Sequence, residues 1–175
     1  RYPFPFDPPY VPQDIPCGAY VHNFEYHREE KASKAFLNFE GVDSCFYVWV
    51  NGAYAGYSQV PHATSEFDVT DLLNEGENTL AVLVLKWCDG SYLEDQDKFR
   101  MSGIFRDVYL LKRPETTIRD YYITTDVEKD SVVVKLDMHF AEPVETKVTI
   151  EDKYGAVVAR GGTAENGVLE LTVLN

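Results

Sequence analysis

A dense run of acidic and aromatic residues at positions 87–107 is where this chain could do chemistry. Four carboxylates fall within nine positions there, at Asp89, Glu94, Asp95 and Asp97. Clustered carboxylates are the ligands that hard cations prefer. The run separates two strand-like segments, and structureless loops of about 15 residues inside compact domains are usually functional or disordered. Its mixed composition favours a functional loop.

Two familiar uses of paired carboxylates fit this loop poorly. An EF-hand calcium loop needs Gly at its sixth position, but a count from Asp89 places Glu94 there, between strands rather than helices. A glycosidase needs carboxylates on opposite sides of the scissile bond, which two acids on one loop rarely provide. We therefore expect most of these acids to face solvent or to pair with Arg100 and Arg106.

Other reactive side chains show no catalytic spacing. The four histidines lack the spacing of metal ligands, and neither a nucleophile elbow nor a Gly-rich phosphate loop is present. We interpret His22 as a packed residue of an aromatic strand face. We expect Cys45, Trp49 and Trp87 to belong to the core, although either tryptophan could stack on a sugar. The proline-rich opening at 2–12 is expected to lie across the sandwich as an extended arm, and it could also bind a partner.

Composition narrows the classes of partner. The chain of 175 residues carries 16 Lys and Arg against 29 Asp and Glu, for a net charge of −13. This acidity argues against nucleic acid and against anionic membrane surfaces, which both need basic patches. No stretch approaches the ~20 apolar residues of a membrane span. Twelve Tyr, ten Phe and two Trp supply too much apolar surface for a disordered chain.

The cysteines and the first residue bear on the origin of the chain. Cys17, Cys45 and Cys88 are odd in number and form no CxxC pair, so zinc is disfavoured and a reduced, cytoplasmic setting is expected. The chain begins at Arg1, with neither an initiator Met nor a signal-peptide pattern. We expect it to be a piece of a longer protein.

The hydrophobic pattern of the first two thirds is that of strands. Asn51-Gly52 predicts a hairpin, because both central residues of a type I′ turn need positive φ. The segment 78–87 is the most apolar and is expected to be central, whereas 70–73 is expected to form one helical turn. The pattern predicts a jelly-roll β-sandwich. The expected strands are 19–26, 35–39, 45–50, 53–59, 65–69, 78–87 and 104–113.

A second, shorter domain is predicted after a linker at 113–117. Its strands resemble the opening of an immunoglobulin-like sandwich, which usually needs about 100 residues. We therefore expect two domains, 1–113 and 114–175, of which the second is partial. Its expected strands are 118–125, 131–140, 146–153, 156–160 and 168–174.

The acidic loop carries a specific family resemblance. The run DGSYLEDQD at 89–97, followed by RMSGIFRD at 100–107, resembles the signature of the sugar-binding domain of β-galactosidases in glycoside hydrolase family two. The resemblance covers 2–114, and the part from 115 on resembles the first immunoglobulin-like domain of the family. Further matching segments are Pro8 to Pro12, Asn51-Gly52, Gly56-Tyr57, Ser65 to Asp68 and Gly76 to Asn78.

The resemblance implies a role for this chain in a larger enzyme. It implies a galactose-binding-domain-like jelly roll, then an immunoglobulin-like domain, then a (β/α)₈ barrel with two catalytic Glu residues. A barrel takes ~250 residues, so the chain is expected to be a non-catalytic fragment of a retaining β-galactosidase that hydrolyses terminal β-D-galactosides. The loop Asp89–Asp107 would reach the active site of that barrel.

One site residue carries over from the family. By resemblance, Asp97 would contact the galactose and help to hold Na⁺, whereas the other Na⁺ ligands and the Mg²⁺ site belong to the barrel. A single carboxylate is not a cation site, so we expect this fragment alone to bind no cofactor tightly. A substrate-contacting Asn of the family would lie two positions before Arg1. Arg100, Arg106 and Asp107 are interpreted as bracing the loop through ion pairs.

Two other functions stay open at this point. The chain could be a stand-alone carbohydrate-binding module, which should show an exposed aromatic platform. It could instead be a structural or assembly domain of a β-glucuronidase or β-mannosidase relative. Because unpaired edge strands recruit neighbours, self-association into a homo-oligomer is also an expectation.

Overall fold

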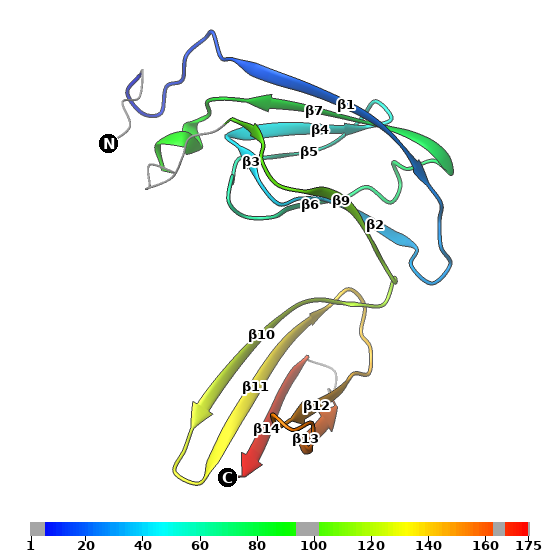
Figure 1. Ribbon diagram of the computed structural model, residues 1–175, viewed down its shortest axis with the longest axis vertical. Helices are drawn as coiled ribbons and strands as arrows, with labels where there is room; N and C mark the ends of the chain where they lie inside the picture. Colours follow the sequence, from blue (N-terminus) through cyan, green and yellow to red (C-terminus); the bar gives the residue numbers. More distant parts are fainter. Residues whose placement is uncertain (1–5, 94–101, 163–166, 175) are drawn as a thin grey trace. The chain divides into compact units, whose positions relative to one another are not determined.

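The computed structural model describes residues 6–93, 102–162 and 167–174. The chain folds as two compact units, Arg1–Arg113 and Pro114–Asn175 (Figure 1). Both are built from antiparallel strands, so the prediction of an all-β chain with sandwich architecture is confirmed. In the described part of the chain, no helix is long and apolar enough to cross a membrane.

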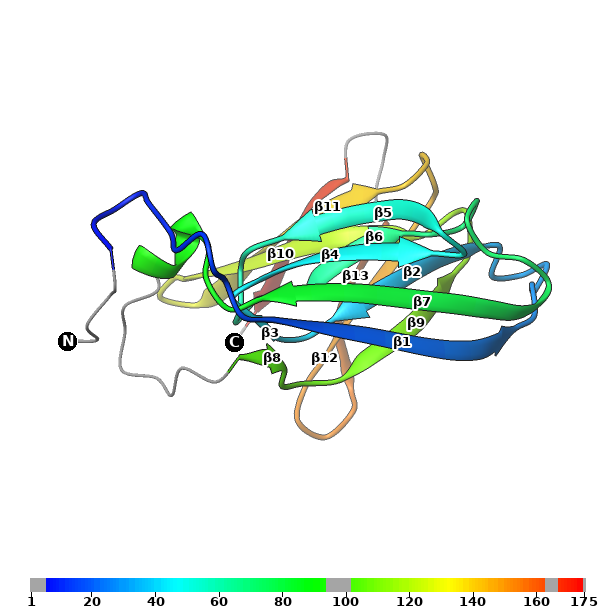
Figure 2. The ribbon, with the colours of Figure 1, turned by 90° about the horizontal axis from the view of Figure 1, so that it is seen from above.

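The first unit is a sandwich of two main sheets (Figures 1 and 2). Its four-stranded sheet has the order β1 (Cys17–Tyr26), β7 (Gly76–Leu85), β4 (Cys45–Val50) and β5 (Ala53–Ser58). The facing three-stranded sheet has the order β6 (Ser65–Asp68), β2 (Lys34–Phe39) and β9 (Val108–Arg113). A short pair, β3 (Val42–Asp43) and β8 (Gly103–Ile104), stands beside them. The interior place of β7 confirms that the most apolar segment is central.

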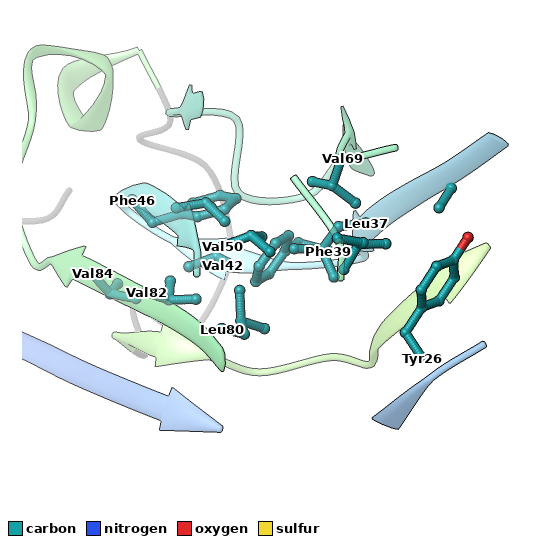
Figure 3. Close-up of a cluster of buried hydrophobic side chains, with 13 residues drawn as sticks. Tyr26, Leu37, Phe39, Val42, Phe46, Val50, Val69, Leu80, Val82 and Val84 are labelled. Atoms are coloured by element: carbon teal, nitrogen blue, oxygen red, sulfur yellow. The ribbon is translucent and has the colours of Figure 1, made fainter. Parts of the chain in front are cut away.

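The core lies between the two sheets (Figure 3). Successive residues of a strand point to opposite faces, so alternate residues of β4 and β7 enter the core. Phe46 of β4 meets Phe39 of β2 with ring centroids 4.8 Å apart. It also meets Phe67 of β6 edge-on at 5.9 Å. Burying each such side chain contributes about 1.5–3 kcal/mol, so these contacts hold the sheets face to face.

The turn between β4 and β5 is the predicted hairpin. Asn51 has φ +51° and Gly52 has φ +81°, the left-handed pair that a type I′ turn needs. The turn returns β5 beside β4, with Trp49 opposite Tyr54. The Asn-Gly signal therefore predicted this turn correctly.

The second unit has two small sheets. One has the order β10 (Ile118–Val127), β11 (Ser131–Phe140) and β14 (Val168–Leu174). The other pairs β12 (Lys147–Glu151) with β13 (Val157–Gly162). Many of its apolar side chains are exposed, including Tyr121, Tyr122 and Val127. Met138 and Leu171 are buried in it.

Three local expectations differ from the structure. Residues 70–72 form a hydrogen-bonded turn rather than a helical turn, with the N–H of Leu72 bonded to the carbonyl of Val69. The expected strand 104–113 is divided between β8 and β9, because the chain leaves the first pairing before it joins β2. A short 3₁₀ helix, η1 (Asp89–Tyr92), was not expected.

Candidate functional site

The acidic loop begins at η1, directly after β7, and its first turn is held by local hydrogen bonds. The N–H of Cys88 donates to Ser91 Oγ at 3.1 Å. Asp89 Oδ1 accepts the N–H of Gly90 at 2.8 Å. A Cβ on Gly90 would lie 3.5 Å from the carbonyl oxygen of Gln59, so the turn packs closely on the chain that follows β5. These contacts fix the direction in which the loop leaves the sheet.

Tyr92 joins this turn to the start of the chain. Its hydroxyl donates to the carbonyl of Phe6 at 2.9 Å and also contacts the carbonyl of Tyr10. We call residues 6–12 the N-terminal arm; it lies beside η1 in Figure 1. The arm and the beginning of the loop thus form one connected surface.

The loop ends at a second anchor directly before β3. The N–H of Phe105 donates to the carbonyl of Gly41, and the N–H of Glu40 donates to the carbonyl of Asp107, each at 3.1 Å. The Arg106 guanidinium lies 3.5 Å from the carbonyl of Glu40 and 5.5 Å from the centroid of the Phe105 ring. Backbone pairing therefore contributes to this anchor, and the ion pairs expected of Arg106 and Asp107 stay a prediction. Both ends of the loop are fixed to the sandwich.

Most of the predicted site residues fall outside the described residues. Glu94, Asp95, Asp97 and Arg100 belong to this group, so the role of Asp97 stays a prediction. Asp89 is described and its side chain is exposed. Within 6–93, 102–162 and 167–174, no group of three or more His, Cys, Asp or Glu side chains could hold a metal ion. The described residues therefore do not by themselves form the Na⁺ or Mg²⁺ site that the resemblance implies.

A row of aromatic side chains lies on the outer face of β4 and β5. Tyr47 and Tyr57 meet with ring centroids 4.8 Å apart, and Trp49 lies 6.0 Å from Tyr54. Trp49 is partly buried on the face opposite the core, so the expectation that it is a core residue is wrong. It alternates with core residues along β4, and the apolar run of this strand concealed that alternation.

The outer face also brings two thiols together. Cys45 opens β4 and pairs with the last residue of β7, and Cys88 follows β7 by three residues. Each of the two thiols is the largest influence on the pKa of the other, so their side chains lie close together. Cys45 is buried, as expected, but it lies outside the core cluster. No motif spacing could have revealed this pair, because the residues are far apart in the sequence.

Hydrogen bonding separates the acidities of the two thiols. The pKa of Cys88 is lowered to about 6, because the Cys45 thiol, the Ser91 hydroxyl and the N–H groups of Ser91 and Gly90 favour the thiolate. The hydrogen bond to Cys88 and burial raise the pKa of Cys45 well above its usual value. Cys88 is thus the more acidic thiol of the pair.

An apolar cavity of about 600 Å³ opens between β1 and β9. Among the residues that the structure describes, its lining includes no carboxylate. His22 lies at its edge, exposed and stacked on Phe24 at 6.5 Å. Apolar lining residues are Leu37, Phe39, Leu80, Val82, Val108 and Leu110.

Comparison of the sequence with protein families gives a match over the whole first unit. The model of glycosyl hydrolases family 2, sugar binding domain, matches residues 1–114. A β-galactosidase of Actinobacillus pleuropneumoniae is 57% identical over 74% of this chain and 13% of its own length. A β-galactosidase of Vibrio cholerae is 40% identical over 95% of this chain and 17% of its own length. The chain thus spans less than a fifth of these relatives.

Solved structures with a similar fold cover both units. An FMN-binding β-glucuronidase from Facaelibacterium prausnitzii L2-6 aligns with a TM-score of 0.81 at 21% identity, over 91% of this chain and 27% of that one. A β-D-glucuronidase of Dictyoglomus thermophilum aligns with a TM-score of 0.77 at 21% identity, over 93% of this chain and 31% of that one. At this identity the likeness shows the fold alone.

Proposed function

Because this chain belongs to glycoside hydrolase family 2, we propose that it is the N-terminal, non-catalytic part of a retaining β-galactosidase. In this proposal the parent enzyme hydrolyses terminal β-D-galactosides on a (β/α)₈ barrel outside residues 1–175. The observation that carries the proposal is the 57% identity, over 74% of this chain, to a protein named β-galactosidase.

The galactoside preference is supported by sequence rather than by fold. Several proteins named β-galactosidase share 49–57% identity with this chain over about three quarters of its length. The glucuronidases that share its fold are only 20–25% identical. Fold alone does not determine substrate, because function depends on the residues of the site.

The loop Asp89–Asp107 is proposed to extend from the sandwich into the active site of the barrel. Its two anchors support this role, because a loop fixed at both ends can present side chains to a neighbouring domain at low entropic cost. The first anchor is η1 with Ser91, and the second is the pairing around Gly41.

Asp97 is the residue on this loop that we propose to contact the sugar. Its carboxylate would accept a hydrogen bond from a galactose hydroxyl and supply one oxygen ligand to a Na⁺ ion that barrel residues complete. Binding energy gained at such a remote hydroxyl can be used at the anomeric centre if it increases in the transition state. Loss of the contact would then reduce kcat as well as affinity.

The test is Asp97→Ala in the full-length parent enzyme, assayed on a chromogenic β-galactoside with and without Na⁺. We expect kcat/KM to fall by about tenfold or more, since a hydrogen bond to a charged group is worth about 1.5–3 kcal/mol. The Na⁺ response should weaken with it. Asp71→Asn is the matched control, because Asp71 is an exposed acid on another loop of the same unit. Unchanged kinetics and Na⁺ response in Asp97→Ala would refute the role of Asp97.

The parent activity needs a separate measurement. The parent should hydrolyse a β-galactoside faster than the matching β-glucuronide, and the 175-residue chain alone should hydrolyse neither. Turnover by the chain alone would mean that its own carboxylates are catalytic. A parent that prefers the glucuronide would overturn the galactoside assignment and leave the family unchanged. Glycan binding by the chain alone would instead favour a carbohydrate-binding module.

A further inference from the structure

We propose that Cys45 and Cys88 form a redox-active dithiol, which hydroperoxides convert to a disulfide at the first anchor of the acidic loop. Neither the family membership nor the proposed function requires these thiols. The inference depends on their contact, their surroundings and their unequal acidity.

The backbone brings the two residues together without distortion of the fold. Cys45 is opposite Leu85 in the β4–β7 ladder, and neighbouring strands lie about 4.8 Å apart. The hydroxyl of Ser44 donates to the carbonyl of Lys86 at 2.8 Å, so the chain stays beside β4 after the ladder ends. Cys88 follows this stretch, and each thiol is the largest influence on the pKa of the other, so the two side chains lie close together. A disulfide requires the sulfur atoms to approach to about 2.05 Å from this contact.

The environment favours reaction at Cys88 first. Cys88 Sγ lies 3.7 Å from Ser91 Oγ, and the N–H groups of Gly90 and Ser91 also face it. These donors lower the pKa of Cys88, so a thiolate is present at neutral pH. Cys88 is 7% exposed and Cys45 is 1% exposed, so a small oxidant such as hydrogen peroxide suits the site better than a bulky disulfide.

The reaction balances with one hydroperoxide. The Cys88 thiolate attacks a peroxide oxygen and the O–O bond breaks. Hydroxide leaves and takes up the proton that Cys88 released, which gives water and a sulfenic acid on Cys88. Cys45 Sγ then attacks that sulfur, the S–O bond breaks, and the hydroxyl group leaves with the Cys45 proton as a second water. Two thiols and one hydrogen peroxide thus give one disulfide and two waters.

The three cysteines allow a clean assay. Cys17, Cys45 and Cys88 fall in separate tryptic peptides, residues 2–28, 35–86 and 87–98. Cys17 is exposed and serves as the internal control. The chain would be treated with hydrogen peroxide at neutral pH and its free thiols counted after denaturation, before and after reduction with dithiothreitol.

We expect the count of free thiols to fall from three to one and to return to three on reduction. Peptide mapping should find 35–86 linked to 87–98. Cys17→Ser should keep the response, whereas Cys45→Ser should leave Cys88 to oxidise to an acid that dithiothreitol does not reverse. Three persistent thiols, a link through Cys17, or over-oxidised Cys88 beside free Cys45 in the unmodified chain would each overturn the proposal. The mapping of the unmodified chain decides the question even if a variant fails to fold.

Discussion

Asn78 should be the most sensitive polar residue of the first unit. Its side chain is 1% exposed and makes four hydrogen bonds. Its Nδ2 donates to the carbonyls of Asn74 and Gly76, each at 2.8 Å. Its Oδ1 accepts from Asn51 Nδ2 at 2.7 Å and from the N–H of Asn74 at 2.8 Å. The amide therefore joins the β4–β5 turn to the start of β7.

Asn78→Leu keeps the branched outline of the side chain and removes all four hydrogen bonds. At about 1 kcal/mol for each bond, and with some partners near the surface able to bond water instead, we expect a loss of about 2–4 kcal/mol in unfolding free energy. With a urea slope of about 1.5 kcal/mol/M, the midpoint should fall by about 2 M. Both tryptophans, Trp49 and Trp87, belong to the first unit, so tryptophan fluorescence reports its unfolding without contribution from the second.

The matched control is Asn23→Leu on the neighbouring strand β1. Asn23 is exposed, and its Oδ1 accepts one hydrogen bond, from Thr79 Oγ1 at 2.9 Å. Exposed substitutions of this kind usually change stability by less than about 0.5 kcal/mol. If Asn78→Leu lowered the urea midpoint no more than Asn23→Leu, the reasoning that buried amide bonding stabilises this unit would be wrong.

Three further predictions concern the first unit. The N–H of Arg28 and the side chain of His27 hold the pKa of Glu75 below its usual value of 4.5. A carboxyl group whose pKa is lowered by folding stabilises the folded state at pH values above its pKa in the unfolded chain. The difference in unfolding free energy between the unmodified chain and Glu75→Gln, measured by urea titration, should therefore shrink as the pH falls below about 4.5. A difference that does not change with pH would contradict this prediction. A Cβ at Gly56 would clash with the ring of Phe67 on β6, so Gly56→Ala should lower the urea midpoint. An unchanged midpoint would show that the ring can move aside. Tyr92→Phe removes the hydroxyl that is hydrogen-bonded to the N-terminal arm, so amide hydrogen exchange in residues 6–12, followed by mass spectrometry, should become faster. The same exchange rate as in the unmodified chain would mean that other contacts hold the arm.

Short-range patterns predicted the strands well. The apolar run of β7 and the Asn51-Gly52 pair depend on neighbouring residues, so they are readable without the fold. The same patterns failed at β4, where a continuous apolar run concealed that Trp49 faces outward. They failed also at 104–113, because the break between β8 and β9 depends on which strands those residues pair with.

The sequence by itself determined the all-β class, the hairpin between β4 and β5, and the family, through the motif at 89–107. Tertiary structure alone decided how the end of that loop is anchored and that Cys45 and Cys88 lie close together. The physical reason is range. Propensity and periodicity act over a few residues, whereas the second anchor and the cysteine pair join segments more than forty positions apart. Only the pairing of strands brings such segments together.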